Sequence, residues 1–164
     1  DPSTTMGPMA QARIADFIRE QKAEALRKGA TAHINMKVEY DVAGSPYIAP
    51  EVLTNVDHQM SVMREESFGP IVGIMKVRND EEALALMNDS PYGLTASVWT
   101  TDTDHAAALG DRIETGTVFM NRCDYVDPGL VWTGVKDTGK GGAMGVVGYQ
   151  NLTRPKSYHL REAI

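Results

Sequence analysis

The chain has 164 residues, 42% hydrophobic and 23% charged, a composition typical of one globular domain and unlike that of a disordered or collagen-like chain. The excess of 22 Asp and Glu over 16 Lys and Arg gives a net charge of −6. That charge argues against a general binder of nucleic acid or anionic membranes, because both need a basic surface. A single cysteine, Cys123, excludes an internal disulfide and favours a reducing, cytoplasmic location.

The first half of the chain predicts one helix followed by irregular and extended chain. Residues 9–28 place apolar side chains at helical spacing with polar residues on the other face, and Gly29 is a suitable end. A short strand is predicted over residues 33–40. After a turn, residues 47–53 are predicted to be extended.

The second half alternates strands and helices. An apolar run of strand length is followed by a helix capped by Asn79 or Asp80, a second strand, a helix capped by Asp102 and ended by Gly116, and a third strand. The three strands cover residues 71–77, 95–100 and 117–120. This βαβαβ order predicts an α/β fold, with a parallel twisted sheet of three neighbouring strands running the same way and helices on both faces.

In open α/β sheets, ligands bind beyond the carboxyl ends of the strands, so residues 121–132 are the place to look for a site. Cys123 lies there and could act as a thiolate nucleophile. A nucleophilic thiol needs a nearby base or cation, and no histidine lies within 15 residues in sequence. The pattern therefore favours a thiol in a pocket wall or core. The histidines and the cysteine show no metal-ligand spacing, so no metal site is predicted.

Residues 134–140 fit the first seven positions of the phosphate-binding pattern GxxxxGK[ST]. The eighth position is Gly141, which lacks the hydroxyl that holds Mg²⁺, and Asp137 would put a negative charge in the anion cradle. The segment is therefore predicted to be a loop whose glycines permit tight turns, with the phosphate loop as the disfavoured alternative.

Two further sets of residues have both a functional and a purely structural interpretation. Glu65 and Glu66 could belong to a solvated acidic loop, or one of them could bind the vicinal hydroxyls of a ribose. Tyr125, Val126 and Trp132 could line a small-molecule pocket, although the residues by themselves favour plain packing.

Five segments together resemble the aldehyde dehydrogenase superfamily. They are EESFGP (65–70), SPYGLTASVWTTD (90–102), GTVFMN (116–121), TGVKDTGKG (133–141) and the tail LTRPKSYHL (152–160). The likeness covers nearly the whole chain, and the order of these motifs makes it specific. It implies the C-terminal portion of an NAD(P)-dependent enzyme, with residues 1–148 in the catalytic domain and residues 149–164 as an oligomerisation arm.

The resemblance also implies a reaction. In the family, a cysteine thiolate attacks an aldehyde to give a thiohemiacetal, a hydride passes to NAD or NADP, and a glutamate-activated water hydrolyses the resulting thioester. The thiol, the glutamate and the nucleotide domain are expected to lie outside this chain, so no catalytic residue is assigned to it and the isolated chain is expected to be inactive.

Several residues match family positions that touch the cofactor or the substrate. The resemblance implies that Glu66 binds the hydroxyls of the nicotinamide-side ribose and that Phe68 packs against the same ribose. The substrate channel is expected to include Cys123, Tyr125, Val126 and Trp132. Asn121 is expected to fix loop backbone. The chain reads VWTG where many relatives read PFGG, and Val126 stands where relatives often place an aromatic. The identity of the aldehyde substrate therefore stays open.

The tail carries the expected partner contact. Residues 157–160 are a short terminal strand whose open backbone groups seek a sheet edge, and the family resemblance implies a homo-oligomer through this arm. A small-molecule aldehyde is the other expected partner, with no nucleic acid and no membrane. The alternative is a noncatalytic oligomerisation module of the same fold.

Overall fold

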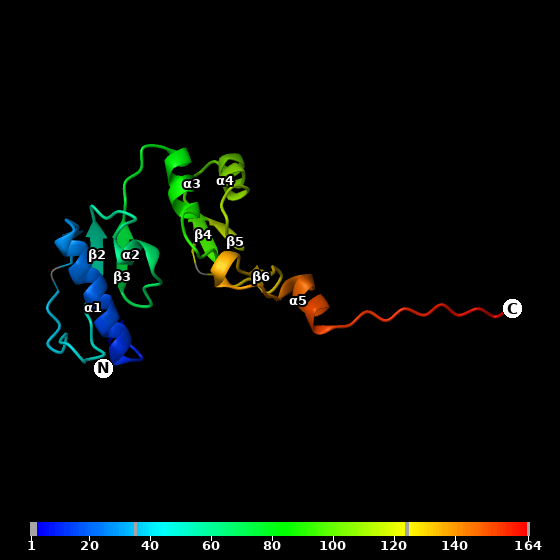
Figure 1. The fold of residues 1–164 in the computed structure, drawn as a ribbon, viewed down its shortest axis with the longest axis horizontal. Helices are drawn as coiled ribbons and strands as arrows, with labels where there is room; N and C mark the ends of the chain where they lie inside the picture. Colours follow the sequence, from blue (N-terminus) through cyan, green and yellow to red (C-terminus); the bar gives the residue numbers. More distant parts are fainter. Residues whose placement is uncertain (1–2, 35, 124, 164) are drawn as a thin grey trace. The chain divides into compact units, whose positions relative to one another are not determined.

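The computed structural model describes residues 3–34, 36–123 and 125–163. The chain forms two compact units, Asp1–Arg78 and Asn79–Ile164, which we call the first and the second unit (Figure 1). Among the described residues, no helix combines the length and the apolarity that a membrane span requires.

The first unit begins with helix α1, Ala12–Arg27, which confirms the predicted helix. Gly29 follows it with a φ of 103°, a left-handed conformation that suits glycine and ends the helix. The inward face of α1 places Ala15, Ile18 and Ala25 in the core. Helical spacing of these small and branched residues lets the helix pack closely on the sheet of the same unit.

A sheet of three strands completes the first unit. It contains β1 (Thr31–Ala32), β2 (Glu51–Thr54) and β3 (Ile71–Ile74), with short helix α2 (Ser61–Arg64) before β3. The order is β1-β2-β3, with β2 parallel to β3 and antiparallel to β1. The main core cluster packs around Leu53, which is fully buried.

The predicted strand at residues 33–40 is wrong, since β1 ends at Ala32 and the described residues of that range form no strand. The cause is a buried side chain. The Glu51 carboxylate accepts a hydrogen bond from the Ile34 amide (2.9 Å), and it shares the His33 amide (3.1 Å) with the Val52 carbonyl (3.0 Å), so beyond His33 the backbone bonds to a side chain instead of extending the ladder.

The second unit contains the predicted alternation of helices and strands. Its elements are α3 (Asp80–Asn88), β4 (Thr95–Val98), α4 (Thr103–Gly110) and β5 (Thr117–Met120), and β4 is parallel to β5. Both predicted caps are confirmed. The side chain of Asn79 accepts from the Glu82 amide at 3.0 Å, and that of Asp102 accepts from the His105 amide at 2.9 Å.

One detail of the predicted alternation is wrong. Helix α4 ends at Gly110 and not near Gly116, because the Asn88 side chain accepts from the Glu114 amide and donates to the Arg112 carbonyl. Strand β3 pairs with β2 inside the first unit, and β4 pairs with β5 inside the second unit. That β3, β4 and β5 form one sheet, which would span both units, stays a prediction. The α/β class with parallel strands is confirmed.

The rest of the second unit is a small hairpin and one helix. Strands β6 (Trp132–Thr133) and β7 (Gly142–Ala143) pair antiparallel around the 3-10 turn η1 (Lys136–Thr138), and helix α5 (Gly145–Leu152) follows. Residues 153–163 are exposed and contain neither helix nor strand (Figure 1). The predicted arm strand has no ladder within the described chain.

Candidate functional site

The loop between α2 and β3 presents the two residues expected at the cofactor. Glu66 is exposed and makes no hydrogen bond or ion pair with another described residue. The Phe68 ring is 70% exposed, which is unusual for so large an apolar side chain. The Glu66 carboxylate and the Phe68 ring, only two positions apart in the sequence, are therefore both available to a ligand.

This loop is anchored to α1 on both sides of Phe68. The Ser67 hydroxyl donates to Gln21 Oε1 at 2.8 Å, and Gln21 is itself buried. On the other side, a Cβ atom on Gly69 would lie 2.9 Å from Ile18 Cγ1 and 3.2 Å from Met9 Cε. Only glycine allows so close an approach, and the approach holds the exposed ring beside the start of the helix.

At the end of β5, one amide side chain fixes the neighbouring backbone. Asn121 has a φ of 54°, and its Oδ1 accepts from the Thr100 amide at 2.9 Å while its Nδ2 donates to the Thr100 carbonyl at 2.7 Å. The Ser97 hydroxyl donates to the Arg122 carbonyl at 2.5 Å. The expected role of Asn121 in fixing loop backbone is confirmed, and the ends of β4 and β5 are joined.

The loop after β5 carries three of the four expected channel residues. Cys123, Tyr125 and Val126 are all exposed. The Arg122 guanidinium lies 3.8 Å above the centre of the Tyr125 ring, a cation–π contact that orders this ring. No described residue makes a hydrogen bond or ion pair with the Cys123 thiol, so the geometry supplies no base for a nucleophile there.

Trp132, the fourth expected channel residue, lies in β6 opposite Ala143 and is half-buried. Glu66 and Phe68 belong to the first unit, and the four channel residues belong to the second. That all six residues belong to one active site, as the family resemblance implies, therefore stays a prediction.

The glycine-rich segment after β6 is bound to the SPYGL turn by backbone hydrogen bonds. The Val135 amide donates to the Gly93 carbonyl at 3.0 Å, and the Asp137 amide donates to the Pro91 carbonyl at 2.8 Å. The Gly93 amide donates to Thr138 Oγ1 at 2.8 Å. The amides of Val135 and Asp137 are thus occupied, and the segment leads into strand β7 where a phosphate loop would open a helix, which counts against the phosphate-loop alternative.

Lys136 is a structural anchor that the sequence reasoning missed. Its ammonium donates to the carbonyls of Asn88 at 2.7 Å and Ser90 at 3.0 Å, and it pairs with the Glu114 carboxylate at 2.6 Å. Its φ is 55°. The signal was available in the pattern, since this lysine lies in TGVKDTGKG (133–141) beside the glycines that allow the close approach.

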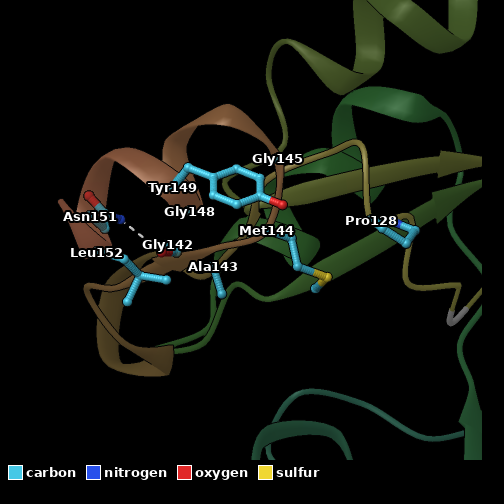
Figure 2. Close-up of a pocket in the computed structure, with 9 residues that line it drawn as sticks. All are labelled: Pro128, Gly142, Ala143, Met144, Gly145, Gly148, Tyr149, Asn151 and Leu152. Atoms are coloured by element: carbon cyan, nitrogen blue, oxygen red, sulfur yellow. Dashed lines mark hydrogen bonds between the residues drawn. The ribbon is translucent and has the colours of Figure 1, made fainter.

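Figure 2 shows a mostly apolar hollow of about 310 Å³ in the second unit, which the sequence reasoning also missed. It lies between Pro128 and helix α5, and Met144, Tyr149 and Leu152 contribute its larger side chains. It contains none of the six expected site residues, although Pro128 follows Val126 by two positions.

Among the described residues, the structure shows no group of three or more acidic, histidine or cysteine side chains that could hold a metal ion.

Comparisons with known proteins agree with this geometry. The chain is 35% identical to the succinate-semialdehyde dehydrogenase [NADP(+)] of Deinococcus radiodurans, over 95% of this chain and 32% of that protein. The aldehyde dehydrogenase of Mycobacterium tuberculosis complexed with NAD+ superposes with a TM-score of 0.85 at 31% identity, over 98% of this chain and 34% of that one. The succinic semialdehyde dehydrogenase of Streptococcus pyogenes, in complex with NADP+, gives 0.81 at 29% identity, over 91% and 32%.

The chain spans about a third of the length of the curated relatives it matches. Relatives named for NADP(+) or NAD(P)+ are among those it matches, and the two solved structures named above hold NAD+ and NADP+. The model of the aldehyde dehydrogenase family matches residues 1–158, and the chain therefore belongs to the aldehyde dehydrogenase family.

Proposed function

We propose that this chain functions as part of an enzyme that oxidises an aldehyde to a carboxylic acid with NAD or NADP. The observation that carries this proposal is the family match across residues 1–158. The motifs behind the match also have structural roles in this chain, in the Gly69 approach to α1 and the Asn121 bridge.

Glu66 and Phe68 would hold the nicotinamide half of the cofactor. Glu66 has a carboxylate with no partner among the described residues, which can accept hydrogen bonds from two vicinal ribose hydroxyls. Phe68 offers an open ring face against which a ribose can pack. The residues thus fit the group, and the bound cofactor would supply the hydride acceptor of the reaction.

The substrate would pass the second unit's loop after β5. We assign Cys123, Tyr125, Val126 and Trp132 to the wall of the aldehyde channel. The thiolate that attacks the aldehyde and the glutamate that activates water for thioester hydrolysis are assigned to parts of the enzyme other than this chain. Cys123 is left as a wall residue because no described group is placed to activate it.

The isolated 164-residue chain is expected to show no aldehyde-dependent reduction of NAD or NADP, because the proposed nucleophile and base are not among its residues. The measurement is absorbance of the reduced nicotinamide during incubation with a panel of aliphatic and aromatic aldehydes. The matched variant is Cys123→Ala, which removes the chain's one thiol. Turnover by the wild-type chain that disappears in Cys123→Ala would show that Cys123 is the nucleophile and would contradict the assignment.

We also propose that the segment after α5 pairs with the sheet of a second copy. Tyr158 is 71% exposed and Leu160 is 84% exposed, and no described residue of 153–163 takes part in a ladder. Alternate side chains of an added strand would point to the same face, so these two could be buried together. The alternative of a noncatalytic module predicts the same assembly without binding of nicotinamide.

Deleting residues 153–164 is expected to convert an oligomer of the full chain into a monomer, as measured by analytical ultracentrifugation. The cut leaves α5 intact, since that helix ends at Leu152. Deleting only residues 162–164 is the control and should leave the oligomer unchanged. Equal masses for the full chain and the longer deletion would count against a role of this segment in assembly.

A further inference from the structure

A hollow of about 260 Å³ opens where the loop before β3 meets the start of α1. Its lining residues come from both segments and are Met9, Ala10, Gln11, Arg13, Ile14 and Phe68. The hollow has fixed walls, because the Met9 amide donates to the Pro46 carbonyl at 2.8 Å and Gly69 holds its loop against Ile18. The exposed ring of Phe68 forms part of the wall of this hollow.

Arg13 brings the positive charge to this wall. Its side chain is exposed and makes no hydrogen bond or ion pair with another described residue. The carboxylate one turn along the helix, Asp16, is already held by the Gly44 amide at 3.0 Å and by Arg19 at 2.6 Å. The Gly44 amide and the Arg19 guanidinium also lower the pKa of Asp16, outweighing the opposing effect of desolvation. Asp16 thus has partners of its own, and Arg13 keeps its charge for a ligand.

A nucleotide has two chemically different ends that this surface can distinguish. Its ribose hydroxyls suit a carboxylate, whereas its phosphate is repelled by one and needs a cation. A guanidinium is the better cation for this purpose, because it donates two parallel hydrogen bonds to phosphate oxygens. Glu66, two residues before Phe68, offers the carboxylate, whereas Phe68 and Arg13 line the same hollow and offer an apolar face and a guanidinium.

We propose that Arg13 binds the phosphate of the nicotinamide mononucleotide half of the dinucleotide, with the ribose of that half over Phe68. This inference rests on the proposed function, in which Glu66 and Phe68 hold the same ribose. Arg13 thereby determines specificity for a phosphorylated ligand.

The test compares two probes that differ by one phosphate, nicotinamide mononucleotide and nicotinamide riboside, titrated into the full chain while backbone amide resonances are followed by NMR. The wild-type chain should bind the mononucleotide about tenfold tighter, the factor expected for one charge-assisted interaction. Arg13→Gln should remove this preference and leave the affinity for the riboside unchanged. Arg13→Lys should restore part of it. The control is Arg27→Gln, an equal charge change at an exposed residue at the other end of α1, which should keep the preference.

Other outcomes separate the two proposals. If both probes shift the resonances of residues 66–68 with equal affinity, or if Arg13→Gln keeps the preference, the role of Arg13 is overturned and the proposed cofactor site stands. If neither probe shifts those resonances in the wild-type chain, Arg13 and the assignment of Glu66 and Phe68 are overturned together.

Discussion

Replacing Gly116 with alanine is expected to lower the free energy of unfolding of the second unit by more than about 3 kcal/mol, the upper end of what overpacking costs. A Cβ atom at this position would lie 1.7 Å from the Thr133 carbonyl oxygen and 2.5 Å from its carbon. Both atoms are backbone, so no side-chain rotation can relieve the clash. Either the start of β5 or β6 must move, and a shift of Gly116 would also strain the hydrogen bond from its amide to the Gly93 carbonyl.

Urea denaturation followed by circular dichroism and by tryptophan fluorescence would measure the effect, since Trp99 and Trp132 both lie in the second unit. The matched control is Gly141→Ala. No heavy atom lies within 4 Å of the Cβ position there, and its backbone is not left-handed, so a change below about 1 kcal/mol is expected. Equal midpoints for the two variants would mean that β5 does not approach β6 as closely as the structure shows.

Elements with a local cause could be predicted from the sequence. The predicted start of helix α3 is confirmed, since an asparagine cap and three acids in its first turn fix that start within four positions. The strand at residues 117–120 is likewise confirmed, because β-branched and aromatic residues follow a glycine turn. In each case the residues that define the element lie within one turn of it.

Elements that depend on residues far away in the sequence could not be predicted. Strand β3 pairs with β2 across 20 residues of chain, and nothing in the short run of residues 51–54 distinguished a sheet strand from extended loop. The end of α4 depends on Asn88, which lies in the preceding helix and bonds to Glu114. Such partners are chosen by the tertiary fold, and pattern reasoning along the chain does not reach them.

The residues of the candidate site also divide into those that the sequence could predict and those that only the fold brings together. The family motif identified Glu66 and Phe68, and the structure adds that both are exposed and that the loop is anchored on either side of the ring. Arg13 could not be found from the sequence, because its helix position resembles that of any solvent-facing arginine. Only the fold brings it to the same hollow as Phe68, 55 positions later in the chain.

The second large effect is expected at Glu51, a carboxylate that is only 3% exposed. Its Oε1 accepts from the amides of His33, Ile34 and Val52, and its Oε2 lies 2.6 Å from the Lys22 ammonium. Glu51→Leu removes the acceptor of the Ile34 and Val52 amides and of the Lys22 ammonium, while the His33 amide keeps the Val52 carbonyl, and it should lower the free energy of unfolding of the first unit by about 3 kcal/mol. Glu51→Gln keeps one amide-accepting oxygen and should cost less.

The stability lost on substituting Glu51 should depend on pH in a defined direction. Burial acts to raise the pKa of Glu51, but the Lys22 ammonium and the backbone amides of Ile34 and His33 outweigh it and leave the pKa below its usual value. The carboxylate therefore stabilises the fold fully above the unfolded pKa of about 4.3, and this stabilisation is lost as pH falls through the lower folded value. The stability gap between wild type and Glu51→Gln should be largest near about pH 7 and shrink below about pH 4.

Urea unfolding of both proteins across this pH range measures the gap, with Glu20→Gln as the control. Glu20 is exposed on the same unit's helix α1 and makes no hydrogen bond or ion pair with another described residue, so its substitution should give a small and nearly constant difference. A Glu51→Gln gap that stays constant down to about pH 3 would show that the ionised carboxylate contributes nothing specific. The stability would then come from the shape of the side chain, and the Lys22 pair would be an ordinary surface contact.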